Sequence, residues 1–568
     1  MAVLSLHDSV FLDRVQKHNN AQRMEEKHGD WENNRIFANK NQGAMAETRN
    51  RRLPVGIQSF EKIRKDGYLY VDKTDIIWRL ANTDNTYNYL SRPRRFGKSL
   101  LVDTLEAYFL GKKELFEGLR IMELEKEWVK RPVVRLDMSQ AGAEPESVRS
   151  YLDDVFHTLE AEYKIVVRQD CSLAVRFKNI IEGAYDKTGQ QVAILIDEYD
   201  APLQHSWKTP HHEACTSIYR EVFSILKAND KYERFVFITG ITKFTQISLF
   251  SVLNNLSNIS FEPEYAAICG ITKEEMLRDF KPEIDKLAAY ENHTYDEAVA
   301  QLTAYYDGYH FSHDNMADIF NPFSLVNALS DSKLRNYWAA SGATSLLPKF
   351  VDNIEIRLKN FENCPIDSDT LETSDVTGGG AELFLYQSGY LTIKGYTDGI
   401  YILGIPNYEV RKALYKIVLP ALTLKTNDQV ISTQSMLLYN LQLGNLPEAM
   451  KCLKALVADV PYSNKKLASM DMEERYRLIL STIFNAIGCR VEVEKMIATG
   501  RIDMVVETIH IIYVLELKLS NNGGIHAATQ QIRYKQYAEP FKADKRRVVA
   551  LAIELDDQGK GLVDWKED

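Results

Sequence analysis

Hydrophobic and polar positions follow two different periods along the chain from Leu53 onward. Short runs rich in β-branched and aromatic residues alternate with longer segments in which apolar residues recur at helical spacing. The short runs are YLYVD, TYNYL, VVRLDM, VAILIDEYD and FVFITGIT, and the longer segments include SLLVDTLEAYFLG, SVRSYLDDVFHTLEAEY and SIYREVFSILKA. This alternation predicts a parallel α/β sheet that is covered by helices.

The pattern changes at about Glu274, where helical segments such as EEMLRDFKPEIDKLA become dominant. Two strand-like runs, GYLTIK and IYILGIP, flank the turn residues 396–399 and predict a β-hairpin. Helices beside such a hairpin suggest a winged-helix-like module. After a further helical stretch, the chain ends with a helix, three strands, a helix and a strand between residues 473 and 555, which predicts a second α/β domain.

The composition is that of a globular protein, since 45% of the 568 residues are hydrophobic and 26% are charged. The net charge of -10 gives no overall attraction to nucleic acid, so such a contact requires local basic surface. The six cysteines include no CxxC pair, which argues against a zinc ribbon or a disulfide framework. Because no apolar run could span a bilayer and the first residues lack the order of a secretory signal, we expect a cytoplasmic protein with no membrane partner.

The stretch SRPRRFGKSLL carries the first candidate chemistry. Gly97, Lys98 and Ser99 lie between a predicted strand and a predicted helix, as the second half of a phosphate-binding GxxxxGK[ST] loop does. Arg92 stands where that motif has its first glycine, so a basic turn is the competing interpretation. In a nucleotide site, Arg94 and Arg95 would add charge beside the phosphates, or they would face a partner subunit.

The run VAILIDEYD predicts a buried central strand that ends in Asp197 and Glu198. Ligands of open α/β sheets lie at the carboxyl ends of the strands, so we expect Asp197 to hold Mg²⁺ together with Ser99. Glu198 would polarise the attacking water. The next strand, FVFITGIT, ends near Thr242 and Lys243, which are placed to sense a γ-phosphate.

Residues from about 53 to 311 resemble the AAA-ATPase-like domain family of anaerobic bacteria. The resemblance is carried by LPVGIQSFEKIR, YVDKT, SRPRRFGKSLL, ILIDEYDAPL and ITGITKFTQISLFSVLNNL. RPRRFGKS is the usual form of the loop in that family, so the resemblance favours a nucleotide loop. It implies an AAA+ or STAND-type P-loop fold that binds ATP and Mg²⁺.

GRIDMVV and YVLELKL carry the second candidate chemistry. Side chains alternate across a strand, so Glu516 and Lys518 share one face, and Asp503 on the preceding strand can meet them across a hairpin. Two carboxylates can bind one or two divalent metals, and a lysine beside them can orient the water that attacks a phosphodiester. The alternative is an edge strand whose glutamate and lysine form a solvated pair.

This D-x12-E-x-K arrangement resembles the PD-(D/E)XK nuclease superfamily, and TGRIDMVV and AATQQIRYKQY resemble the nuclease-like domain that often follows this ATPase family. The resemblance implies Mg²⁺, or Mn²⁺, at Asp503 and Glu516. By the same pattern Glu474 would be an outer metal or water ligand. Gln531 and Lys535 would contact the substrate backbone.

These features predict an α/β multidomain protein. Its regions are a polar, mobile arm (1–50, with Met1 or Met45 as the start), a P-loop domain (51–275), a helical lid and winged-helix-like region (276–430), a helical linker (431–465) and a restriction-endonuclease-like domain (466–568).

The function that we expect is an ATP-regulated, metal-dependent endonuclease of a bacterium, acting on DNA rather than RNA in defence or mobile-element biology. The alternative is a nucleotide-dependent switch or scaffold whose nuclease-like domain binds nucleic acid without cutting it. A homo-oligomer could form through the ATPase domain. Arg94, Arg95 and Arg234 are each eligible as an arginine finger in it.

Overall fold

The computed structural model divides into two compact units, residues 1–54 with 62–70, and residues 55–61 with 71–568. The expected mobile arm and the alternative start at Met45 lie outside the described residues. Among the residues that are described, no helix combines the length and the apolar character that a membrane crossing requires. The described residues are 52–166, 171–243, 256–341, 361, 363–373, 380–422, 427–458 and 470–568.

The N-terminal half forms the predicted parallel sheet. Its strands lie in the order β2-β3-β4-β1-β5, and every neighbouring pair is parallel. β3 is buried along its whole length between β2 and β4, which explains why its sequence is apolar up to Asp197. The strands are β1 (Tyr87–Ser91), β2 (Val133–Asp137), β3 (Val192–Asp197), β4 (Glu233–Gly240) and β5 (Ser257–Asn258).

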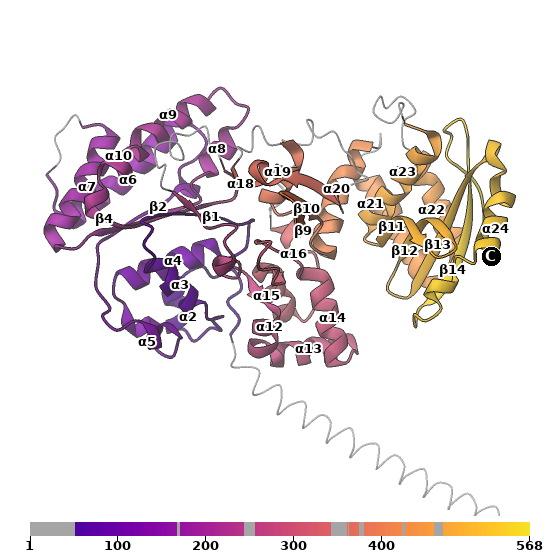
Figure 1. The fold of residues 1–568 in the computed structure, drawn as a ribbon, viewed down its shortest axis with the longest axis horizontal. Coiled ribbons are helices and arrows are strands. Elements are labelled where there is room, and N and C mark those ends of the chain that lie inside the picture. Colours follow the sequence, from indigo (N-terminus) through magenta and orange to yellow (C-terminus); the bar gives the residue numbers. More distant parts are fainter. Residues whose placement is uncertain are drawn as a thin grey trace, which may run out of the picture. The chain divides into compact units, whose positions relative to one another are not determined.

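Helices cover both faces of this sheet (Figure 1). One face is covered by α6, α7 and α9, and the other by α3 and α4. The helices of this half are α2 (Phe60–Lys65), α3 (Thr74–Ala81), α4 (Lys98–Phe109), α5 (Ile121–Leu124), α6 (Pro145–Tyr163), α7 (Leu173–Thr188), α8 (Ala201–Ser206), α9 (His212–Phe223) and α10 (Ile225–Ala228).

The prediction of a strand at YLYVD, residues 68–72, is wrong. Tyr68 makes only an isolated bridge to Arg52, and the N–H of Leu69 donates to the Arg52 carbonyl over 2.9 Å. The run therefore pairs with one residue only, whereas a β-strand requires a neighbouring strand to pair with. The local sequence pattern does not show whether such a neighbour exists.

The middle region consists of helices around a small antiparallel sheet. The predicted hairpin is confirmed: β9 and β10 pair across a turn in which Asp398 (φ 51°) and Gly399 (φ 82°) are left-handed, as a tight two-residue turn requires. A third strand, β8, pairs with β10 and was not expected. The elements are β6 (Ile271–Thr272), α12 (Lys273–Asp279), α13 (Lys281–Glu291), α14 (Tyr295–Tyr306), β7 (Ile319–Phe320), α15 (Pro322–Asp331), α16 (Tyr337–Ala340), β8 (Cys364–Asp367), α18 (Ser368–Thr373), α19 (Gly380–Gln387), β9 (Thr392–Thr397), β10 (Ile400–Gly404) and α20 (Tyr408–Leu422).

The C-terminal region is a mixed sheet with the order β11-β12-β13-β14-β15, in which only β13 and β14 are parallel. The helix and strand order predicted from the sequence is confirmed, and β15 is an additional edge strand. The elements, after the linker helices α21 (Asn427–Leu443) and α22 (Leu446–Ala458), are α23 (Met472–Ile487), β11 (Arg490–Ile497), β12 (Gly500–Glu507), β13 (Ile511–Leu519), α24 (Gly524–Lys535), β14 (Arg547–Leu555) and β15 (Leu562–Glu567).

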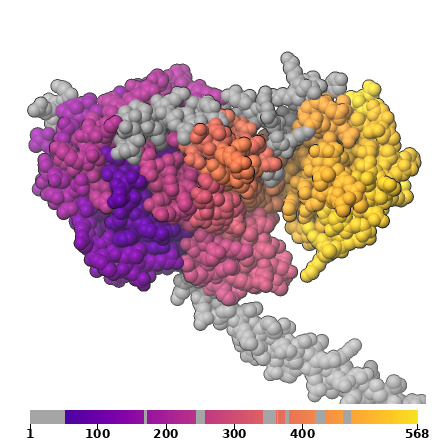
Figure 2. Space-filling model, viewed as in Figure 1, coloured from indigo at the N-terminus to yellow at the C-terminus, as the bar shows by residue number. Residues whose placement is uncertain are grey.

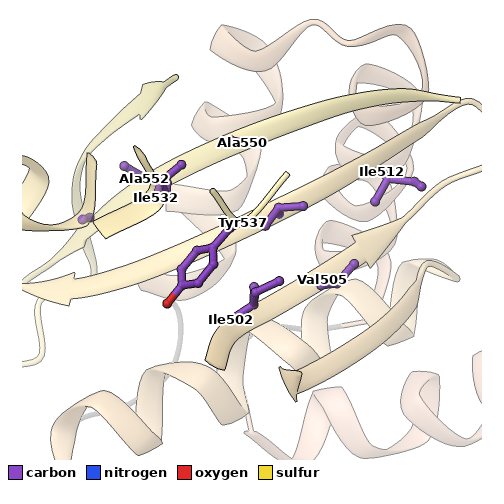
Figure 3. Packing of buried hydrophobic residues seen from close by; sticks show 9 residues of the cluster. Ile502, Val505, Ile512, Ile532, Tyr537, Ala550 and Ala552 are labelled. Carbon is purple, nitrogen blue, oxygen red and sulfur yellow. The ribbon is translucent and has the colours of Figure 1, made fainter. Parts of the chain in front are cut away.

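A cluster of buried side chains joins α24 to this mixed sheet (Figure 3). Ile512 and Val514 of β13 pack with Ala528 and Ile532 of α24, and the ring of Tyr537 belongs to the same cluster. The space-filling view shows the described part of this region, coloured from orange to yellow, as one continuous body (Figure 2). The cluster fixes α24 against the strands that carry the acidic residues.

Candidate functional site

The loop between β1 and α4 has the backbone of a phosphate-binding loop. Gly97 is left-handed (φ 90°) and precedes the first residue of α4, Lys98. No acidic residue lies in the first turn of α4, so its N–H groups and positive dipole end favour an anion. Arg95 is also left-handed (φ 71°), a conformation that is uncommon for a residue with a side chain.

Arg92, at the position of the missing glycine, is a structural residue. Its side chain is buried: one terminal nitrogen donates to the carbonyls of Ser91 (2.8 Å) and Ser260 (2.9 Å), and the other donates to the carbonyl of Tyr265 (3.0 Å). Its guanidinium lies 4.1 Å from the centre of the Phe311 ring. Arg92 thus ties the loop to two other segments instead of pointing at a ligand.

Lys98 and Asp197 come together although β4 lies between their strands. Burial raises the pKa of Asp197 to about 6, while a hydrogen bond with Ser99 and the charge of Lys98 act in the opposite direction. The ammonium of Lys98 donates to the carbonyls of Arg92 (2.9 Å) and Pro93 (3.2 Å) in its own loop. A lysine, a hydroxyl and a carboxylate therefore share the mouth of the loop.

Two further acidic residues lie beside Asp197. Glu198 follows it with a left-handed backbone (φ 44°), and its N–H donates to Asp197 Oδ1 over 2.9 Å. Asp137, at the end of β2, stands in register with Asp197, and its charge also raises the pKa of Asp197. Asp137 was missed in the sequence, although it ends the run VVRLD in the same way that Asp197 ends VAILID.

Asp200 connects the ends of β3 and β4. Its buried carboxylate accepts from the backbone N–H groups of Ile241 (3.0 Å) and Thr242 (2.6 Å) and from the Thr242 hydroxyl (2.6 Å). Gln204 donates to both Asp200 and Thr242, and its amide oxygen accepts from Arg94 over 3.4 Å. The structure thus joins Arg94 and Thr242 through two residues that the sequence analysis did not single out.

The remaining loop residues contact the middle region. The Phe96 ring lies 4.8 Å from Tyr309 and 5.3 Å from Phe311, each in an edge-on arrangement. Arg95 donates to the Ser341 carbonyl over 3.1 Å, and its guanidinium lies 5.2 Å from the centre of the Phe323 ring.

Lys243, at the end of β4, also contacts the middle region. Its N–H donates to the side-chain oxygen of Gln387 over 3.2 Å, and its ammonium donates to the Glu372 carbonyl over 2.9 Å. The loop and the β4 end are therefore both attached to the region that follows the ATPase-type sheet.

The second candidate site lies where the pairing between β12 and β13 ends. Met504 pairs with Leu515, and the next step of the antiparallel ladder brings Asp503 to Glu516. Asp503 Oδ2 accepts from the N–H of Leu517 over 2.9 Å, and Lys518 Nζ donates to Glu516 Oε1 over 2.8 Å. The three predicted residues therefore converge, and a solvated edge pair does not describe them because Glu516 is fully buried.

At this second site the two carboxylates, Asp503 and Glu516, repel each other when both are charged. Burial, and next the charge of Asp503, raise the pKa of Glu516, whereas its hydrogen bond with Lys518 lowers it. Burial lowers the pKa of Lys518, but the hydrogen bond and charge of Glu516 prevail and leave that pKa raised. Glu516 Oε2 is buried and has no hydrogen-bond partner within the described residues.

Two sequence families match the chain in these two regions. The family described as predicted AAA-ATPase matches residues 54–250, and the PD-(D/E)XK nuclease superfamily matches residues 471–565. A curated protein of Azotobacter chroococcum mcd 1, described as an uncharacterized protein in the vnfD 5′ region, is 31% identical over 528 residues. The match covers 90% of this chain and 98% of that protein.

The chain belongs to the AAA-ATPase-like family with a C-terminal PD-(D/E)XK nuclease domain. The orphaned Glu516 Oε2 fits such a domain, because a divalent cation between two close carboxylates would supply the missing positive partner. Within the part of the chain that the structure describes, no group of three or more His, Cys, Asp or Glu side chains could hold a metal ion. Any metal at Asp503 and Glu516 therefore needs further ligands from backbone, water or substrate.

The first helix of the nuclease domain brings charge to this site. Arg477 lies 3.6 Å from Asp503 Oδ1 and 2.8 Å from Glu494 Oε1. The charge of Glu473 raises the pKa of Lys518. Glu474, the residue named from the family pattern, lies in the same first turn of α23, where its N–H donates to Asp471 over 3.5 Å.

Helix α24 brings the two predicted substrate residues to the same side of the nuclease domain. Gln531 donates to the Tyr537 hydroxyl over 3.0 Å, and that hydroxyl donates to the Arg501 carbonyl over 2.8 Å. Lys535 lies over Gly500, where an added Cβ would be 3.4 Å from its Cδ. Tyr537 was missed in the sequence because its hydroxyl reaches the site only through the folding of α24 onto the sheet.

Proposed function

We propose that the chain is an ATP-binding protein with a metal-dependent nuclease domain, and that it acts as an ATP-regulated DNA endonuclease. The observation that carries this proposal is the convergence of Asp503, Glu516 and Lys518 at the edge of the β12–β13 ladder. A fully buried glutamate beside a second carboxylate is costly in a domain that has no use for it.

At the nuclease site, Asp503 and Glu516 would hold Mg²⁺ or Mn²⁺. The bound ion would neutralise charge as it builds on the phosphodiester. Lys518, already oriented by Glu516, would hold the attacking water in line. Glu474 would act as an outer ligand of the ion or of water. Gln531 and Lys535, on α24, would bind the substrate backbone, and DNA is the nucleic acid we propose.

At the nucleotide site, Lys98 would turn from the loop carbonyls that it contacts to the outer phosphates of ATP. Gly97 would let the backbone N–H groups approach those phosphates, and Ser99 and Asp197 would hold Mg²⁺. Glu198 would polarise the attacking water. This arrangement is supported by the effects of Ser99 and Lys98 on the pKa of Asp197.

The other nucleotide-site residues would link ATP to the rest of the chain. Arg94 and Thr242 share the Gln204 and Asp200 network, while Arg95 and Lys243 contact the middle region. Rearrangement of the loop on ATP binding would change these contacts, which is how we propose that ATP controls the nuclease domain. A homo-oligomer through the ATPase domain would allow an arginine finger from Arg94, Arg95 or Arg234.

The decisive experiment incubates the purified full chain with plasmid, linear duplex and single-stranded DNA, and with RNA. Each substrate is tested with Mg²⁺, Mn²⁺ or EDTA, and with or without ATP. Cleavage that needs metal, disappears in Asp503→Asn and Glu516→Gln, and responds to ATP in wild type but not in Lys98→Ala supports the proposal. Nucleic-acid binding without cleavage under every condition would instead assign the chain as a switch or scaffold.

We further propose a cytoplasmic role in bacterial defence or mobile-element biology. This rests on the pairing of an ATPase-type domain with a nuclease domain, and on analogy of architecture alone. The measurement is the efficiency of plasmid establishment and phage infection in cells that carry wild type or Asp503→Asn. Equal efficiencies in the two strains would refute this role.

A further inference from the structure

Strands β11 and β12 continue past the nuclease site as a two-stranded arm. The β11–β12 ladder runs on to Ile497 opposite Gly500, whereas the β12–β13 ladder begins at Met504 opposite Leu515. Residues 495–502 therefore form a hairpin beyond Asp503, and we call it the arm.

The arm is attached to the end of α24. The hydroxyl of Thr499 donates to the Lys535 carbonyl over 2.5 Å, and Gly500 leaves room for the Lys535 side chain. The Tyr537 hydroxyl donates to the Arg501 carbonyl over 2.8 Å. The arm and the helix end thus form one continuous surface.

This surface exposes apolar and cationic side chains together. Tyr534 is 84% exposed on α24. The Lys535 ammonium lies 5.7 Å from the centre of the Tyr534 ring. Arg501 lies between Gly500 and Ile502, which both face α24, so its side chain points to the other face of the arm, where Glu494 is 3.4 Å away. A single exposed tyrosine is ordinary, but an aromatic ring with a lysine ammonium beside it, close to the proposed nuclease site, suits an unpaired nucleic-acid strand.

The surface is continuous with the nuclease site. Gln531 donates to the Tyr537 hydroxyl over 3.0 Å, and Tyr537 packs in the same cluster as Ile502, the residue before Asp503. Tyr534 lies three residues after Gln531 on α24, so the two side chains are neighbours on one side of the helix. A strand whose phosphate reached Lys518 would pass Gln531 and then meet Tyr534.

We propose that this surface binds an unpaired strand of nucleic acid, and that Tyr534 stacks on one of its bases. The proposal rests on the proposed nuclease function and adds its substrate class: single strands, flaps or gaps are preferred to continuous duplex. A base inside a duplex offers no free face to a tyrosine, whereas every unpaired base does. Lys535 would contact a phosphate next to that base.

The test measures binding without cleavage, by fluorescence anisotropy of a labelled oligonucleotide in EDTA, as a single strand and as a duplex. We expect Tyr534→Ala to weaken single-strand binding roughly 5- to 150-fold and duplex binding less than about twofold. Tyr534→Phe should keep single-strand affinity, since it keeps the ring. Lys535→Gln should reduce the salt dependence of binding by about one phosphate contact, which Tyr534→Ala should leave unchanged.

The matched control is Tyr290→Ala on α13. Tyr290 is 57% exposed and has the Lys333 ammonium 5.4 Å from its ring centre, so it resembles Tyr534 away from the nuclease domain. Its substitution should leave both affinities unchanged. Since Tyr534 is exposed, its variants should also unfold at the wild-type temperature.

Equal losses for single strand and duplex in Tyr534→Ala, or no loss, would overturn the inference. A change of oligomeric state in that variant, measured by light scattering, would also overturn it and assign the surface to a second copy of the chain. Wild type that binds single strands through Tyr534 but cleaves nothing would refute the nuclease proposal alone. The two proposals can therefore fail separately.

Discussion

Replacing Asp197 by asparagine should stabilise the ATPase domain while removing its response to ATP. Burial raises the pKa of this carboxyl from 3.8 to about 6, even though Ser99 and Lys98 favour its charged form. The folded protein therefore keeps a proton on Asp197 at pH values where the unfolded chain has lost it. Asparagine has nearly the same shape and carries no charge, so it avoids the cost of burying a carboxylate.

The sign and size of the effect follow from linkage. Between about pH 4 and about pH 6 the folded state binds more protons at Asp197 than the unfolded state, so stability falls as the pH rises through that window. A shift of roughly two pKa units corresponds to about 3 kcal/mol, and this loss is complete above pH 6. Asp197→Asn should therefore exceed wild type by about 1 to 3 kcal/mol at pH 7.5 and by little at pH 4.

The assay is urea unfolding of wild type and variant at several pH values, followed by tryptophan fluorescence. Glu114→Gln, at an exposed carboxylate of the same domain, is the control and should change nothing. Mg²⁺-ATP should raise the stability of wild type but not of Asp197→Asn. A stability difference that does not vary with pH, or a variant less stable than wild type at pH 7.5, would refute the role given to burial.

The remaining predictions concern ATP, cleavage and their coupling. Lys98→Ala should weaken ATP binding by about 2 to 3 kcal/mol in calorimetry, and unchanged affinity would contradict the loop assignment. Glu516→Gln should lower metal-dependent cleavage at least about a hundredfold. In wild type, cleavage should increase with pH as Glu516 ionises, because its pKa is raised, and a rate that falls with pH would oppose this. Arg95→Ala should keep ATP affinity yet weaken the effect of ATP on cleavage, since it breaks the Ser341 contact.

The sequence alone determined the main helices and strands of both α/β regions and the strand ends at which the reactive residues lie. The run VAILID is apolar up to Asp197 because both faces of β3 are covered, and such an apolar run can be recognised without knowledge of the rest of the chain. Glu516 and Lys518 share a face because side chains alternate along a strand, so their pairing needed only the assignment of β13. Asp503 could be assigned to the same site because an antiparallel hairpin between the two predicted strands brings it close to Glu516.

The tertiary structure alone decided what each residue contacts across long distances in the chain. In the sequence, Arg92 stood where a phosphate-binding loop has a glycine. Its role in anchoring the loop depends on contacts with the carbonyls of Ser260 and Tyr265 and with the Phe311 ring. The placement of Asp137 beside Asp197 depends on the order of strands, and the run YLYVD had no strand to join. A local pattern records burial and period, whereas hydrogen bonds, strand partners and pKa shifts arise from residues that meet only when the chain has folded.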